Sequence, residues 1–133
     1  MNMNMFVPFD ISGTGKGKHL GYWARNLKDN PHNLPWPGDF IDLNWNPTER
    51  DLVVNYLERP WCTDFYYGFS PCRLCKQLLA SGDPFDGIYT WPKGFSHYLK
   101  QHNVKPPQEF IDHATGRIRH TITYTPRERL PNY

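Results

Sequence analysis

The sequence lacks a long hydrophobic run and carries little net charge. No apolar segment in its 133 residues approaches the roughly 18 residues that a membrane-spanning helix needs. The N-terminus also lacks the charged and then apolar pattern of a signal peptide. A formal charge of +2 argues against a surface that attracts nucleic acid as a whole, although it leaves room for a local basic patch. We therefore expect a cytoplasmic protein with no membrane anchor.

Cysteine and aliphatic residues are also scarce. The three cysteines are an odd number, which fits a reducing compartment better than a disulfide framework. Hydrophobic residues make up only 38% of the chain, but aromatic residues reach 16%, so we expect a small, aromatic-rich core. Thirteen prolines and ten glycines predict many turns and short elements. A loop-rich fold of this kind gains stability from a bound metal.

Two of the cysteines open a set of four candidate metal ligands. Cys72 and Cys75 form a C-x-x-C motif, and His97 and His102 form an H-x4-H pair downstream. Two thiolates and two imidazoles are the four ligands that a tetrahedral zinc site takes. The spacer between the pairs exceeds the roughly 12 residues of a DNA-binding finger, which leaves room for a loop, a short strand and the start of a helix. We predict a structural zinc site.

Three other residues are reserve ligands, namely Cys62, His113 and His120. Four protein ligands would close the zinc shell and leave no position for water, so a catalytic zinc is disfavoured. The P-C-x-x-C run beginning at Pro71 is half of the zinc deaminase signature, but no H-x-E precedes it. The sequence therefore gives no support to a deaminase.

A helix is expected to begin at Asn46, which can cap it, with Pro47 at the first helical position and Glu49 at the capping-box position. Its predicted apolar face consists of Leu52, Val53, Tyr56 and Leu57. Periodicity and turn residues then predict seven short segments. These are a strand over 62–69, a helical turn over 76–80, a loop over 81–84, a strand over 88–91, a helix over 92–102, a helix from 106 ended by Gly116, and a strand over 117–124.

These elements predict a single small α+β domain, stapled by zinc, with short helices and a small antiparallel sheet. Its expected bounds are residues 21–124. Residues 1–20 are expected to form a flexible N-terminal arm, because their glycine and lysine run lacks the spacing of a phosphate-binding loop. Residues 125–133 are expected to be a loose tail.

Several motifs together resemble a family of short bacterial proteins. The pattern is C-R-x-C at 72–75, D-G-x-Y-x-W-P-x-G at 86–94 and H-Y-x-x-x-H at 97–102, followed by P-x-x-F at 107–110. The likeness covers roughly residues 39–114, and the chain departs from it in the loop 77–84, which lacks an Asn-Gly turn. The resemblance implies a bacterial or phage origin and a metal site at the same four residues. It brings no activity with it.

Three functions are compatible with these features. The leading hypothesis is a zinc finger-like module that binds another macromolecule, with protein as the favoured partner. The second is a nucleic-acid-binding module, based on the basic residues Arg117, Arg119, Arg127, Arg129, Lys100 and Lys105. The third is a metal-dependent hydrolase, which requires one of the four ligands to be absent from the shell. The lack of a recognisable catalytic constellation favours a protein that is not an enzyme.

Overall fold

The computed structural model describes residues 4–7, 17–65 and 68–117, and within them the chain forms two sheets and three α-helices. The helices are α1 (Pro47–Leu57), α2 (Phe95–His102) and α3 (Gln108–Ala114), preceded by a 3-10 turn, η1 (Pro37–Phe40). The strands are β1 (Phe6–Val7), β2 (Lys18–Leu20), β3 (Cys62–Asp64), β4 (Phe69–Pro71), β5 (Leu78–Ala80), β6 (Asp83–Phe85) and β7 (Tyr89–Thr90). The predicted α+β class is confirmed.

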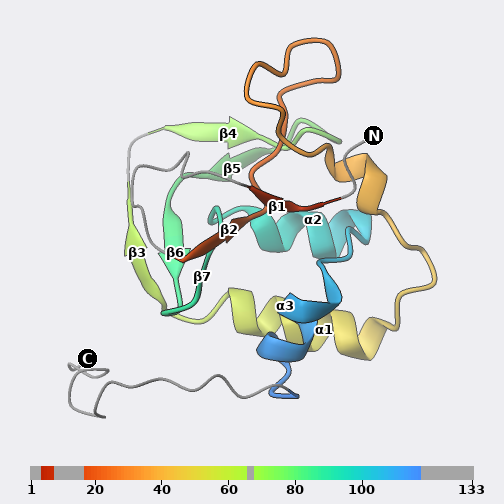
Figure 1. Ribbon diagram of the computed structural model, residues 1–133, viewed down its shortest axis with the longest axis vertical. Helices are drawn as coiled ribbons and strands as arrows, with labels where there is room; N and C mark the ends of the chain where they lie inside the picture. Colours follow the sequence, from red (N-terminus) through yellow and green to blue (C-terminus); the bar gives the residue numbers. More distant parts are fainter. Residues whose placement is uncertain (1–3, 8–16, 66–67, 118–133) are drawn as a thin grey trace.

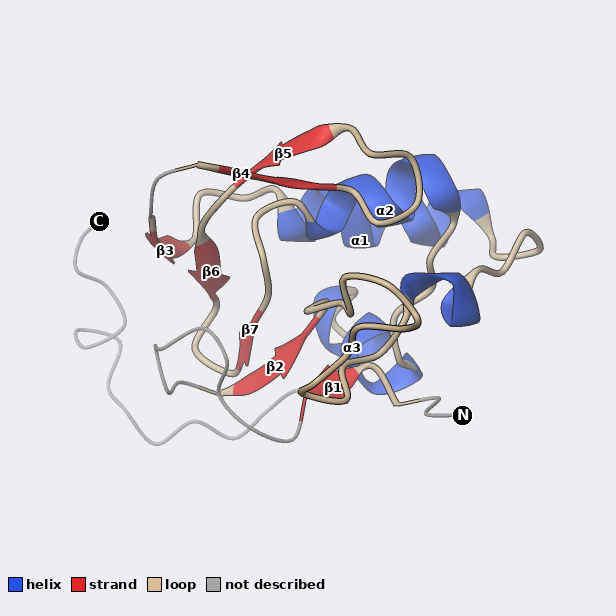
Figure 2. Cartoon of the chain, turned by 90° about the horizontal axis from the view of Figure 1, so that it is seen from above, coloured by secondary structure: helices blue, strands red, loops and turns tan. Residues whose placement is uncertain are grey.

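The larger sheet has the strand order β1-β2-β7-β6-β3, and β4 and β5 form a separate two-stranded sheet. The larger sheet lies on one side of the helices, and β4 and β5 run along another side near α2 (Figures 1 and 2). The predicted sheet was antiparallel, but the observed one is mixed because β2 runs parallel to β7. A parallel pair cannot be joined by a tight hairpin, and here the two strands come from distant parts of the chain. None of the described helices is long and apolar enough to cross a membrane.

The N-terminal segment requires a correction to the predicted domain bounds. Residues 1–20 were assigned to a flexible arm, but β1 and β2 within them are strands of the larger sheet. Leu20 of β2 and Met5, which directly precedes β1, are fully buried. The strands are two and three residues long, which is too short for an alternating pattern to be visible in the sequence.

The C-terminal predictions fall largely beyond the described part of the chain. The predicted strand over 117–124 includes only one described residue, Arg117. The predicted tail over 125–133 lies outside the described residues altogether. These two predictions therefore stay predictions.

Helix α1 begins where the sequence predicts. The Asn46 side chain accepts hydrogen bonds from the backbone N–H groups of Thr48 and Glu49, at 2.8 and 3.0 Å, so it caps the helix. The predicted apolar face is correct for Val53, Tyr56 and Leu57, which are buried. It is wrong for Leu52, which is 52% exposed, while the neighbouring Val54 is buried in its place. Because α1 packs against both α2 and α3, its buried face is wider than predicted and includes Val54.

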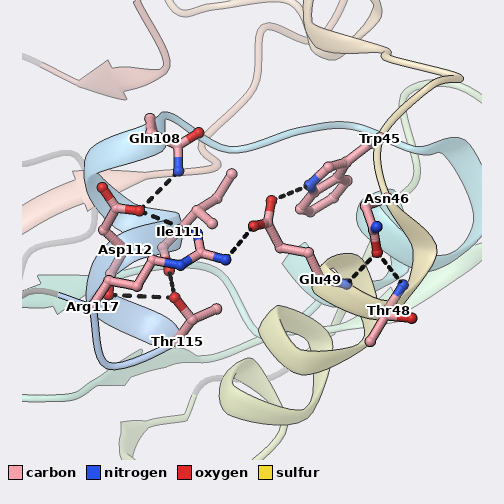
Figure 3. A network of polar contacts seen from close by, with 9 residues as sticks. All are labelled: Trp45, Asn46, Thr48, Glu49, Gln108, Ile111, Asp112, Thr115 and Arg117. Carbon is pink, nitrogen blue, oxygen red and sulfur yellow. Dashed lines mark hydrogen bonds and ion pairs between the residues drawn. The ribbon is translucent and has the colours of Figure 1, made fainter.

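The carboxylate of Glu49 joins α1 to the end of α3, as Figure 3 shows. It accepts a hydrogen bond from the indole N–H of Trp45 at 2.8 Å and forms an ion pair with Arg117 at 2.7 Å. These two partners lower the pKa of Glu49, with the Trp45 bond as the larger cause. Arg117 also pairs with Asp112 of α3 at 3.3 Å. The Glu49 side chain therefore connects two helices, in place of the capping-box role expected for it.

The core between the larger sheet and the helices is aromatic, as the composition predicts. Tyr89, Trp91, Phe95 and Phe110 are all fully buried or nearly so. Tyr89 meets Phe110 edge to face, with ring centroids 5.0 Å apart at 90°. The core also takes in the buried side chains of Met5, Leu20, Trp23, Trp45, Val53, Val54, Leu57, Leu99, Val104 and Ile111. This cluster includes Cys72, and it positions α2, which carries His97 and His102.

Candidate metal centre

The first pair of ligands lies on a tight turn between β4 and β5. The N–H of Cys72 donates to the carbonyl of Gln77 at 2.8 Å, and the N–H of Lys76 donates to the carbonyl of Cys72 at 2.9 Å. Lys76 closes the turn with φ at 70°, in the left-handed region that non-glycine residues seldom adopt. The C-x-x-C segment therefore reverses the direction of the chain and joins β4 to β5 in a hairpin.

Three elements predicted between residues 62 and 84 differ from the observed strands. The helical turn over 76–80 is wrong, because residues 78–80 are strand β5. The loop over 81–84 is partly wrong, because β6 begins at residue 83. The predicted strand over 62–69 divides into β3 and β4, which belong to different sheets. Strands of three residues paired across the chain leave no period that the sequence could reveal.

The second pair of ligands lies on α2. Phe95, Tyr98 and Leu99 face the core as predicted, and His102, two turns after Phe95, lies on the same side of the helix. His97 is in the first turn, and His102 is the last helical residue. Asn103 then ends the helix in the left-handed conformation, with φ at 53°, as the sequence predicts. The imidazole rings lie 5.2 Å apart between centroids.

The four side chains converge on one point. The distance from Cys72 Sγ to His102 Nε2 is 3.5 Å, and that from Cys75 Sγ to His97 Nε2 is 3.4 Å. All four donor atoms lie within 4.8 Å of one another. Zn–S and Zn–N bonds of about 2.3 and 2.0–2.1 Å at tetrahedral angles separate sulfur from nitrogen by about 3.5 Å. The four residues therefore lie close enough to hold a metal ion, and the Cys72–His102 and Cys75–His97 distances are close to the tetrahedral value.

The four donors differ in exposure. Cys72 is fully buried in the aromatic core, and His97 is also buried. His102 is half-buried, whereas Cys75 is exposed. The site thus has a buried side and a side at the surface. Burial lowers the pKa of His97, and the neighbouring His102 lowers it further. The neutral ring that results is the form that ligates a metal.

Hydrogen bonds around the donors fix the turn against α2 and the preceding loop. The hydroxyl of Tyr98 accepts from the backbone N–H of Arg73 at 2.8 Å, and burial raises the pKa of that hydroxyl. The Arg73 guanidinium donates to the carbonyls of Pro71 and Ala24, at 2.7 and 3.2 Å. The backbone N–H of Leu74 donates to Cys72 Sγ at 3.4 Å.

None of the described reserve ligands joins this cluster. Cys62 is exposed on β3, and the group of converging donors does not include it. His113 instead contacts Asp86 and Tyr56 through Nε2, at 2.7 and 3.0 Å. His120 lies outside the described residues. Within the part of the chain that the structure describes, the predicted set of four is the one that is brought together.

A second polar cluster, around Asp86, was not predicted. Its carboxylate is completely buried and accepts from the Tyr56 hydroxyl and His113 Nε2 on one oxygen. The other oxygen accepts from the backbone N–H groups of Ile88 and Tyr89. Burial on its own raises the pKa of Asp86, but the hydrogen bonds from His113 and Tyr56 outweigh it, and the net shift is downward.

The sequence offers only half of the signal for this second cluster. The Asp86-Gly87 pair marks a turn, and the structure has that turn between β6 and β7. Nothing local connects it to Tyr56 on α1 or His113 on α3, because the three are far apart in the chain. No pocket adjoins these residues among the cavities described, and we assign the cluster to the folding of the core.

Within the described residues, Cys72, Cys75, His97 and His102 form the cluster with the clearest chemical potential, because their donor atoms could hold a metal ion. The resemblance of its motifs to short bacterial proteins stays a hypothesis based on the motifs alone. Comparison of the chain with protein-family profiles, with curated proteins and with solved structures gives no match.

Proposed function

We propose that this protein is a small binding module stabilised by one structural zinc ion, held by Cys72, Cys75, His97 and His102. The observation that carries the proposal is the convergence of two thiols and two imidazoles at S···N distances of 3.4 and 3.5 Å. Thiolate and imidazole in a tetrahedral set are the ligands typical of zinc. Four protein ligands leave no position for water, which argues against the hydrolase.

The zinc connects the β4–β5 hairpin to α2. Every residue of β4 is exposed, and β5 is exposed at both ends, so the hairpin buries little surface of its own. A two-stranded hairpin is at best marginally stable in water. Zinc binding by residues on both the turn and the helix supplies the stability that the hairpin does not obtain by burial.

The module acts by binding another macromolecule, and we propose that it is a protein. Phe65, Phe69 and Leu78 on and beside the hairpin are 69, 68 and 64% exposed. Large apolar side chains that gather on a surface mark sites of protein interaction. Phe69 and Leu78 belong to the hairpin that the proposed zinc supports, and Phe65 directly follows β3.

The described basic residues give less support to a nucleic-acid partner. Arg117 pairs with Glu49 and Asp112, and Lys100 pairs with Glu58 at 2.9 Å. Lys105 lies 3.9 Å from Asp42. Cations that are neutralised within the chain are less available for phosphate groups. Arg119, Arg127 and Arg129, also named in that hypothesis, lie outside the described residues.

Metal analysis tests the first half of this proposal. Protein purified without added metal should contain one zinc per chain by mass spectrometry, with a two-sulfur, two-nitrogen shell by X-ray absorption. Cys72→Ser should lose the zinc, and the matched control Cys62→Ser should retain it. A metal-free protein, or a shell containing water, would contradict the structural zinc site.

Partner capture tests the second half. Zinc-loaded protein, cross-linked in extracts of its source cells, should recover the same partner in independent experiments. The Cys72→Ser variant should lose this partner, because the hairpin loses its support. Failure to recover any reproducible partner counts against a binding module.

A further inference from the structure

A groove with a volume of about 780 Å³ opens beside the β4–β5 hairpin. Its walls are β5, the exposed side of α2, the segment that follows α1, and the β3 side of the larger sheet. The apolar side chains of Trp61, Phe65 and Leu79 line it. Leu79 also packs close to Gly94 at the start of α2, where a Cβ atom would come within 2.8 Å of the Leu79 Cβ. The groove is thus attached directly to the metal-supported hairpin.

One wall of this groove is an unpaired strand edge. Strand β5 pairs with β4 alone, in the register Ser70↔Leu79 and Pro71↔Leu78. The hydrogen bond from Cys72 N–H to Gln77 fixes the alternation along the antiparallel pair. The backbone N–H and C=O groups of Leu79 therefore point toward β4. Those of Leu78 and Ala80 point to the opposite edge of β5, away from β4. No described residue pairs with those outward groups.

The groove also has an excess of positive charge. Of the residues that line it, Arg59, Lys93 and Lys100 are basic, and Glu58 is the one acidic residue. Lys100 pairs with Glu58 at 2.9 Å, which leaves two cations. Lys93 lies over the Phe65 ring, 5.5 Å from its centroid, and Arg59 lies over the Tyr56 ring at 4.9 Å. Among the described residues, neither Arg59 nor Lys93 has a carboxylate within ion-pair distance.

We propose that this groove binds an extended, acidic peptide segment of a partner protein, which adds a strand to the free edge of β5. The inference rests on the proposed binding function and names its site and the chemistry of its partner. Strand addition satisfies the outward N–H and C=O groups of Leu78 and Ala80. Side chains of a strand alternate between its faces. The bound segment therefore alternates apolar residues over Leu79 with acidic residues that reach Arg59 and Lys93.

Single-stranded nucleic acid fits the groove less well. Sequence-independent binding to nucleic acid rests on neutralising several phosphates, on the order of six to ten contacts for a duplex. Only two cations of the groove are free of an ion pair among the described residues. A nucleic acid strand also leaves the β5 edge unpaired, because its backbone does not match the ladder of a β-sheet.

The test is a selection of random twelve-residue peptides displayed on phage against the full-length, zinc-loaded protein. The selected peptides, labelled with fluorescein, are then titrated with wild-type and variant proteins by fluorescence polarisation. Leu78→Pro removes one outward N–H at the first residue of an edge strand, a position where proline is tolerated. The double variant Arg59→Glu with Lys93→Glu reverses the two cations. Arg25→Glu with Lys28→Glu changes the net charge equally at exposed positions that do not line the groove.

We expect the selected peptides to alternate acidic and apolar residues. The Arg59 and Lys93 reversal should weaken their binding on the order of tenfold or more, and Leu78→Pro by roughly threefold to tenfold. The Arg25 and Lys28 control should stay within about twofold, because rim charges far from a site act weakly. Zinc content and circular dichroism, measured for every variant, identify any loss of affinity that comes from unfolding.

Three results would overturn this inference while leaving the proposed function standing. The first is selected peptides that bind all folded variants equally, which would place the docking site elsewhere. The second is tighter binding of a fluorescein-labelled oligothymidylate than of any peptide in the groove. The third is a dimer, detected by sedimentation, that Leu78→Pro dissociates, since the edge would then pair with a second copy. A zinc-free protein from which no peptide is selected would instead count against the proposed function itself.

Discussion

The two sheets of this protein are stabilised in different ways. The larger sheet covers an aromatic core, and its strand β7 is completely buried between neighbours. The hairpin of β4 and β5 is mostly exposed, and it contributes Cys72 to the core, with Leu74 and Leu79 partly buried against it. Burial of aromatic surface can support the first region, whereas the second depends on the groups that tie its turn to α2. A bound metal would therefore matter most at the β4–β5 hairpin.

A polar cluster marks each region. Around Asp86, hydrogen bonds join α1, α3 and the β6–β7 turn, and the carboxylate has four donors within the protein. At the other site, two thiols and two imidazoles converge on a common point. The Asp86 cluster is satisfied by protein groups alone. The Cys/His cluster would gain its full stability from the proposed zinc ion, so removing that ion should affect the two regions unequally.

The largest effect is expected from Cys72→Ser. We expect loss of the metal and destabilisation of the domain by several kcal/mol, given that zinc binding contributes about 10–16 kcal/mol in zinc-finger peptides. Hydrogen exchange should show residues 69–80 losing protection first, while the amides of β7 and α2 lose it later. Equal loss in both regions would remove the distinction between them. Cys62→Ser serves as the control, because Cys62 is exposed and outside the cluster.

Truncation of the aromatic core should affect both regions together. Phe110 is fully buried and meets Tyr89 edge to face, so Phe110→Ala should lower the free energy of unfolding by about 3–5 kcal/mol. The hairpin and the larger sheet should then unfold in one transition, measured by urea titration with fluorescence and circular dichroism. A loss below about 1 kcal/mol, as at a surface position, would show that the core is not the source of stability.

Acid should weaken the Asp86 cluster. The pKa of Asp86 lies below its ordinary value of 3.8 in the folded state, so the carboxylate stabilises the fold fully above that value. This contribution is lost as the pH falls through the lowered, folded-state pKa. Asp86→Asn should cost about 1–3 kcal/mol near pH 6, since a buried acceptor with several donors is altered.

The pH dependence of that cost separates the charge of Asp86 from its shape. Urea titrations at several pH values should measure the free energy of unfolding of wild type and of Asp86→Asn. The difference between the two free energies should narrow below pH 3.8. A difference that stays constant across the range would mean that the charged form has no special stabilisation. Performing both titrations in the Cys72→Ser background removes the contribution of metal release in acid.

The smallest effect is expected at the start of α1. Asn46→Ala removes the side chain that caps two backbone N–H groups and should cost about 1 kcal/mol. Asn55→Ala, at an exposed position inside the same helix, is the matched control and should be neutral or slightly stabilising. If both substitutions cost the same, the cap contributes nothing particular to the fold.

The predictable parts of the fold are those with a local signal. Asn46 and Pro47 mark the start of α1, Asn103 marks the end of α2, and Gly116 follows α3 with φ at 81°. The convergence of Cys72, Cys75, His97 and His102 could be predicted because cysteine and histidine have few other uses at such spacing. Each of these features depends on a few consecutive residues and on the chemistry of single side chains.

The parts that could not be predicted depend on contacts between distant segments. Leu52 and Val54 exchange places between surface and core because α1 packs on two helices at once. Strand β5 was expected to be helical, since its three residues become a strand only by pairing with β4. The role of Asp86 likewise needs Tyr56 and His113 beside it, and no pattern along the chain brings them together.

The parallel pairing of β2 with β7 has a consequence for the order of events during synthesis. Lys18 lies opposite Tyr89, so the first part of the larger sheet cannot close until the chain has been made well past its middle. Contacts of such long sequence separation slow folding, whereas the capped helix α1 and the hairpin at the C-x-x-C turn are local. On the ribosome, the two cysteines therefore emerge before β7, and His97 and His102 emerge after it, so the larger sheet and the candidate metal site are completed at nearly the same stage.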